Sequence, residues 1–70
     1  MIWVSRGGVG DMHWLQDYAN NTILARISRS SKHPGQWCGQ LHHTDTIYYR
    51  DTEAEIKQFM ELLVNLEGLV

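Results

Sequence analysis

Four histidines and one cysteine are the side chains of this sequence that could ligate a transition metal: His13, His33, Cys38, His42 and His43. His42 and His43 are neighbours on a predicted strand, so their side chains point to opposite faces. Cys38 and His42 share a face, but four strand residues separate them by about 13 Å, which is too far to chelate one ion. We therefore expect no metal site and no other cofactor.

The same cysteine and a glycine-rich stretch are the features that could support catalysis. Cys38, with a nearby histidine and Asp45, could form a nucleophilic set, but no helix N-terminus or basic cluster is predicted there to favour the thiolate. Residues 6–11 (RGGVGD) could bring backbone N–H groups to a phosphate, but their spacing fits neither a nucleotide-binding loop nor the dinucleotide fingerprint. We expect residues 6–11 to be a connector. Because so small a domain lacks depth for a substrate pocket, we expect no enzyme.

Length and composition predict one small globular domain over residues 1–70. The chain has 70 residues and a net charge of −2, with no segment of low complexity. A single cysteine fits a reducing compartment. No apolar run approaches the roughly 20 residues of a membrane helix, and no signal-peptide pattern is seen. We expect a cytoplasmic protein without a membrane partner.

The clearest element is a helix over residues 51–66 (DTEAEIKQFMELLVNL). Thr52 is the predicted N-cap, and Glu55 three residues later completes a capping box. Gly68 suits a left-handed cap, with the last two residues folding back on the final turn. Spacings of three and four predict a buried stripe, which comprises Ile56, Phe59, Met60, Leu63 and Leu66.

Residues 1–5 read as a short strand, whereas residues 12–19 fit either a helix or a strand. Asn20 and Asn21 accept the positive φ of a two-residue hairpin turn, which favours the strand. Pairing Ala19 with Thr22 sets Trp14 opposite Ile27. In that register the face toward the helix holds Trp14, Tyr18, Ile23, Ala25 and Ile27.

Two further strands are predicted, over residues 36–43 and 46–50, after a Pro34-Gly35 turn. Trp37 and Leu41 share a face of the first strand, and Gly39 between them could mark a bulge or room for a large ring. A two-residue loop would put Tyr48 on that face. A three-residue loop would put residues 47 and 49 there, which we prefer because it buries more apolar area, although the register stays open. The fold class is α+β: an antiparallel meander of three to five strands packed against one C-terminal helix.

The sheet face away from the helix is the first candidate binding surface. An outer face that mixes Leu, Tyr, Cys and Arg is typical of a protein interface. The residues expected there are Leu15, Leu24, Arg26, Ser28, Cys38 and one of the tyrosines at 48–49. The candidate partner-binding residues on this face are Leu24, Arg26 and Tyr48.

The acidic side of the helix is the second candidate surface, with Glu53, Glu61 and Glu67 as its partner-binding residues. Glu53 is also placed to pair with Lys57 four residues on. An acidic helix could occupy a nucleic-acid-binding groove of a partner protein. The outer face and an exposed N-terminal edge strand also offer two routes to a homodimer, and Leu24→Glu should weaken the face-to-face form.

A basic stretch over residues 24–33 (LARISRSSKH) provides the alternative function, nucleic-acid binding. Strands followed by a helix that opens in DTEAE resemble the sheet-reading DNA-binding domains of phage integrases and plant AP2 factors. That resemblance covers roughly residues 22–63, but the acidic balance and the few basic residues on the later strands depart from it. The candidate nucleic-acid-binding residues are Arg26, Arg29, Lys32 and Arg50.

In size and layout the chain also resembles the small proteins that phages and mobile elements encode to block host machinery, including polymerase inhibitors and anti-CRISPR proteins. The resemblance is one of class, a short strand meander with an acidic helix, so it transfers no site residues. It implies a non-enzymatic module that inhibits or modulates a host protein or nucleoprotein complex by covering its surface.

Overall fold

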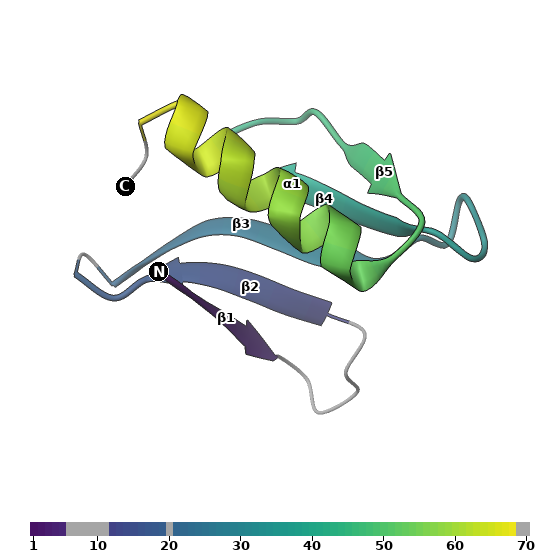
Figure 1. The fold of residues 1–70 in the computed structure, drawn as a ribbon, viewed down its shortest axis with the longest axis horizontal. Helices are drawn as coiled ribbons and strands as arrows, with labels where there is room; N and C mark the ends of the chain where they lie inside the picture. Colours follow the sequence, from purple (N-terminus) through teal and green to yellow (C-terminus); the bar gives the residue numbers. More distant parts are fainter. Residues whose placement is uncertain (6–11, 20, 69–70) are drawn as a thin grey trace.

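A computed structural model describes residues 1–5, 12–19 and 21–68, which form a five-stranded antiparallel sheet and one helix (Figure 1). The predicted α+β meander is confirmed, with the strands in sequential order, and residues 12–17 are strand. Within these residues no helix has the length and apolarity needed to cross a membrane. The elements are β1 (Ile2–Ser5), β2 (Met12–Asp17), β3 (Thr22–Arg29), β4 (Trp37–Leu41), β5 (Tyr48–Arg50) and α1 (Glu53–Leu66).

The start of α1 confirms Thr52 as the N-cap, although the Glu55 carboxylate contacts the Thr52 hydroxyl and not the Thr52 backbone N–H of a complete capping box. The Thr52 hydroxyl accepts the backbone N–H of Glu55 at 3.1 Å and donates to the Glu55 carboxylate at 3.0 Å. The cap satisfies one of the N–H groups that the first turn leaves without a helical partner.

The buried face of α1 differs from the predicted stripe at its last turn. Ile56, Met60 and Val64 are completely buried, whereas Phe59 and Leu63 are half-buried beside them. Leu66, which was expected in the stripe, is 72% exposed. Two residues along a helix correspond to about 200° of rotation, so Val64 and Leu66 cannot both face the sheet.

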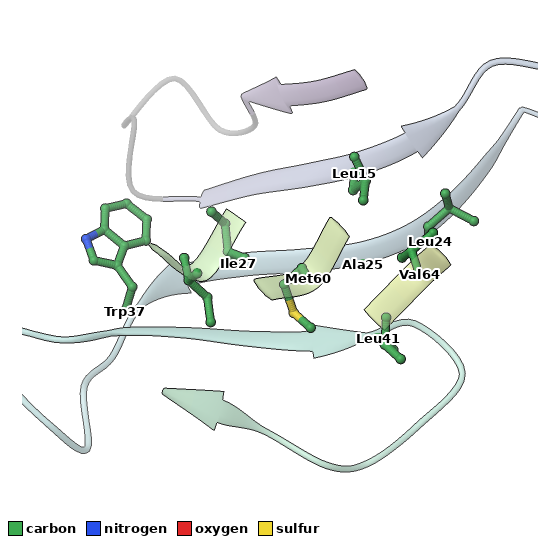
Figure 2. Packing of buried hydrophobic residues seen from close by; sticks show 9 residues of the cluster. Leu15, Leu24, Ala25, Ile27, Trp37, Leu41, Met60 and Val64 are labelled. Atoms are coloured by element: carbon green, nitrogen blue, oxygen red, sulfur yellow. The ribbon is translucent and has the colours of Figure 1, made fainter. Parts of the chain in front are cut away.

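The core lies between α1 and the middle of the sheet (Figures 1 and 2). The helix packs over β3, β4 and β5. Gly39 makes this approach possible, because a Cβ there would lie 2.5 Å from Sδ of Met60 and 3.0 Å from Cδ1 of Ile56. The glycine therefore makes room for the helix rather than for a ring or a bulge. The sheet side chains of the core are Leu15, Leu24, Ala25, Ile27, Trp37 and Leu41.

The predicted register of the β2–β3 hairpin is wrong by one residue from Met12 to Leu15 and by two residues at Gln16 and Asp17. His13 pairs with Ile27 and Leu15 with Ala25, so Leu15 faces the helix and Trp14 the other side. A slip of one residue exchanges the two faces of a strand. The pairing shifts by one residue between Leu15 and Gln16, and this irregularity accommodates Leu24.

The β4–β5 hairpin also differs from the preferred prediction. Gly39 pairs with Tyr48, and Cys38 with Tyr49, so Tyr48 is the tyrosine that faces the helix. Its ring meets that of Phe59 edge to face at 4.9 Å between centroids. The connection runs over residues 42–47, longer than either loop considered, because a turn at Leu41–Thr44 precedes the return to the sheet.

The turn residues adopt the backbone conformations expected from their types. Asn21 has φ of 52°, Gly35 of 88° and Gly68 of 67°, all in the left-handed region. The predicted connector over residues 6–11, Asn20 and the fold-back of residues 69–70 lie outside the described residues.

Candidate functional site

The face of the sheet opposite α1, the outer face, presents side chains in cross-strand rows. Arg26 is the one charged residue in these rows. The others are aliphatic, aromatic or polar without a charge. Ile2 is 44% exposed and Met12 is 42% exposed. The register places the rows as Ile2/Gln16/Ile23, Val4/Trp14/Arg26/Gln40 and Met12/Ser28/Cys38/Tyr49.

A hollow of about 200 Å³ opens on this outer face over β2, β3 and β4. Its floor is main chain, because the side chain of Ile27 turns toward the helix and Gly39 has none. One apolar wall comes from the loop that precedes β5. The side chains around the hollow belong to Met12, Arg26, Ser28, Cys38, Gln40 and Ile47.

The side-chain amide of Gln40 lies beside the guanidinium of Arg26 at the hollow. Its Nε2 donates to the carbonyl oxygen of Thr44 at 2.6 Å, which fixes the amide, and its Oε1 accepts from Nη2 of Arg26 at 3.5 Å. The second contact is long for a hydrogen bond, so it is weak and leaves the donors of the guanidinium largely unsatisfied. Among the described residues no carboxylate lies within ion-pair distance of Arg26.

Of the residues expected to bind a partner through the sheet, Arg26 alone lies on the outer face. Leu24 was expected to point outward, but it is 8% exposed and belongs to the core (Figure 2). The register shift beside it turns both Leu24 and Ala25 inward, which regular alternation could not predict. Tyr48 likewise packs under α1, and Tyr49 takes the outer position.

The glutamates expected to form an acidic docking surface make contacts within the chain. Oε2 of Glu61 accepts from Nε1 of Trp3 at 2.7 Å, and Glu67 lies 3.6 Å from Nε2 of His43. Glu53 meets Lys57 at 2.9 Å, which confirms the predicted pair, and Nε2 of His13 at 3.4 Å. These contacts fasten α1 to β1, to β2 and to the loop after β4.

The electrostatics of Glu53 follow from the same contacts. The hydrogen bond from Lys57 is the main reason that the pKa of the Glu53 carboxyl is held below its ordinary value. Desolvation opposes this effect, while the charges of Lys57 and His13 reinforce it. The carboxylate is thus stabilised in its ionised form by partners within the chain.

The residues proposed for nucleic-acid binding do not share one surface. Arg26 lies on the outer face, and Lys32 lies in the exposed turn after β3. Arg29 and Arg50 flank Trp37 on the helix side, where Arg29 lies 5.2 Å from the Trp37 ring centroid. The Arg50 guanidinium lies 4.0 Å from the ring centroid of Phe59.

Three side chains on the helix side of the sheet lie in a line that resembles a catalytic triad. In that order Ser5 would be the nucleophile, His13 the base and Glu53 the acid. Nδ1 of His13 lies 3.2 Å from Oγ of Ser5, while its Nε2 faces Glu53. Such an order can activate a hydroxyl when a substrate site and oxyanion donors adjoin it. The hollow on the outer face lies on the other side of the sheet from this line, and Lys57 already holds the carboxylate of Glu53. We therefore interpret these contacts as structural: they join β1 to β2 and β2 to the first turn of α1.

No metal-binding group of three or more His, Cys, Asp or Glu side chains occurs among residues 1–5, 12–19 and 21–68. Cys38 lines the hollow with its Sγ 3.4 Å from Oγ of Ser28. The pair supplies weak hydrogen-bonding groups beside the apolar wall.

Sequence reasoning missed several residues of the outer face. Trp14 was assigned to the core because one hairpin register gathers more apolar residues on the helix side. Met12 carried no signal of its own, and Ile47 was expected on the helix side in the preferred loop. The positions of both depend on the register and on the loop after β4. The useful signal was the uncharged composition of β4, whose neighbours β3 and β5 carry only arginines as charged residues.

The outer face is therefore a mixed apolar surface with a hollow and, in its cross-strand rows, one cation. It lies on the opposite side of the sheet from the core that stabilises the fold, so its composition is not explained by packing against α1. Comparison with protein-family models, curated proteins and solved structures found no match to this chain, so no family supplies a function for this surface.

Proposed function

We propose that this chain is a non-enzymatic protein-binding module of the kind phages encode, and that it covers a surface of a host protein or nucleoprotein complex through its outer face. The observation that carries the proposal is the composition of that face, where Arg26 alone is charged. A sheet with one face packed on a core normally presents polar side chains on the other.

The types of residue on the outer face favour protein as the partner. Interfaces are enriched in aromatic residues, Met and Arg relative to the rest of a protein surface. Trp14, Tyr49, Met12 and Arg26 supply these types on adjacent strands. Because strands hold them, little conformational freedom is lost when a partner binds.

The charge distribution disfavours the alternative, sheet-mediated DNA binding. Tight binding to a duplex neutralises several phosphates, and a reading face needs basic residues close together. Here Arg29 and Arg50 lie on the helix side against Trp37 and Phe59, which separates them from Arg26.

Two expected routes to binding are weakened by the contacts within the chain. Glu53, Glu61 and Glu67 fasten α1 to the sheet and its loops, so docking through them would compete with those contacts. The face-to-face homodimer was expected to use Leu24, which is buried. Of the two candidate partner-binding surfaces, we therefore favour the outer face, without Leu24.

Capture from bacterial lysates tests the proposal. Met12→Glu places a charge at the exposed rim of the outer face, and Gln58→Glu makes a matched change on the exposed side of α1. We expect wild type and Gln58→Glu to retain a common protein that Met12→Glu loses. Equal retention by all three proteins, or steeply salt-dependent retention of wild type on non-specific duplex DNA without any captured protein, would contradict the proposal.

A further inference from the structure

Arg26 combines an exposed guanidinium with a partly enclosed setting. Its side chain lines the hollow of about 200 Å³ together with the apolar side chains of Met12 and Ile47. A guanidinium carries five N–H donors in a fixed plane. Gln40 accepts one of them at 3.5 Å, and the described residues bring no carboxylate to the others.

The hollow presents polar and apolar side chains beside the charge of Arg26. Gln40 is itself held by the carbonyl of Thr44, so a fixed amide oxygen lies 3.5 Å from Nη2 of Arg26. Ser28 and Cys38 line the hollow with weak polar groups, whereas Met12 and Ile47 are exposed apolar side chains. The Coulomb attraction between two opposite charges is stronger beside apolar walls that exclude water than on an open surface.

We propose that this hollow binds an Asp or Glu side chain of the partner protein, flanked there by apolar residues that cover Met12 and Ile47. The inference rests on the proposed protein-binding function and names the chemistry of its partner. The carboxylate would accept two parallel N–H bonds from Arg26, the geometry that Arg forms best with a planar anion.

A second copy of the chain does not supply the required group. In a face-to-face dimer each outer face meets its own copy, whose rows hold Arg26 and no acid. Two guanidiniums would then be brought together, or each would lose water without a counter-charge. A partner of different sequence, with an acidic residue, fits the charge of the hollow.

The charge of position 26 provides the test. Random dodecapeptides displayed on phage, each fused through its C-terminus, are selected on folded wild type, Arg26→Gln and Arg26→Glu. Gln58→Glu serves as the control on α1. Because Arg26 is exposed, the variants should melt as wild type does. We expect wild type and the control to enrich peptides with Asp or Glu beside apolar residues, and Arg26→Glu to enrich Lys or Arg at that place.

A synthetic peptide from the wild-type selection should bind Arg26→Gln about 10- to 100-fold more weakly, the range for losing a hydrogen-bonded charged partner. Peptides without acids, or acidic peptides that bind Arg26→Gln equally well, would overturn the carboxylate site.

If those peptides still lose binding to Met12→Glu, the outer face remains a protein-binding surface. If Met12→Glu binds them like wild type, or if no peptide is enriched, the proposed function fails with the inference. Salt-dependent binding of duplex DNA lost in Arg26→Gln would assign Arg26 to phosphate and overturn both.

Discussion

Gly39→Ala tests whether β4 and α1 are packed as closely as the structure indicates. The added Cβ would lie 2.5 Å from Sδ of Met60, against a normal contact of about 3.5–4.0 Å. It would also lie 3.0 Å from Cδ1 and Cγ1 of Ile56. Met60 and Ile56 are both completely buried, so neither can move into solvent to make room.

The expected cost follows from overpacking. An extra carbon in a well-packed core costs about 1–3 kcal/mol. Replacing Gly in a strand returns roughly 0.5–1 kcal/mol of conformational entropy. Since the added Cβ is too close to two completely buried side chains, the upper part of the overpacking range applies, about 2–3 kcal/mol. The net loss of unfolding free energy is therefore about 1–2 kcal/mol, which for a domain of this size lowers Tm by about 5–15 °C.

A double-mutant cycle with Met60→Val provides the assay and its control. Valine ends before the position of the sulfur, so in that background the clash at Gly39 is largely removed. Urea unfolding should show Gly39→Ala costing about 1–2 kcal/mol in wild type and clearly less beside Met60→Val. An equal cost in both backgrounds, or no cost in wild type, would refute the packing of α1 on β4.

Three further changes test other contacts. Thr52→Ala should lower the unfolding free energy by about 1 kcal/mol in urea, because the first turn of α1 loses its cap, and an unchanged midpoint would refute the cap. Phe59→Ala should cost about 1–3 kcal/mol against about 2–5 for Met60→Ala, since Phe59 is half-buried, and the reverse order would contradict the orientation of α1. The pKa of Glu53 is lowered in the folded state. Its contribution to the free energy of unfolding is therefore present above about pH 4.5 and is lost as the pH falls further. Urea midpoints between pH 7 and pH 3 should therefore fall less for Glu53→Gln than for wild type, and parallel curves would refute the Lys57 contact.

The helix and the order of the strands could be predicted because their signals are local. Thr52 and Glu55 carry the cap within three residues, and the turns at Asn21 and Gly35 lie next to the strands that they join. Sequential antiparallel pairing then follows from short connections. None of these features requires knowledge of a contact between distant residues.

The faces of the strands could not be predicted, because they depend on distant contacts. The observed register buries the polar side chains of His13 and Asp17. Ser5 and Glu53 satisfy His13, and the carboxylate of Asp17 accepts the backbone N–H of Ala19. A buried polar group is tolerated when such partners exist, but the partners become visible only in the fold.

The candidate site was predicted in part for the same reason. Arg26 and Cys38 were placed on the outer face, since regular alternation along β3 and β4 holds at those positions. Leu24 was misplaced because the register shift lies beside it, and Tyr48 because the loop after β4 is longer than the loops considered. Single-residue irregularities thus decide which residues form the surface.

Site-specific photocrosslinking tests most directly whether the outer face binds protein. A benzophenone amino acid replaces Met12 at the rim of the hollow or Gln58 on the exposed side of α1, and each protein is irradiated in bacterial cells. The account predicts a discrete protein adduct from position 12 and none from position 58. Adducts from position 58 alone, or crosslinks from position 12 to nucleic acid and not to protein, would contradict it.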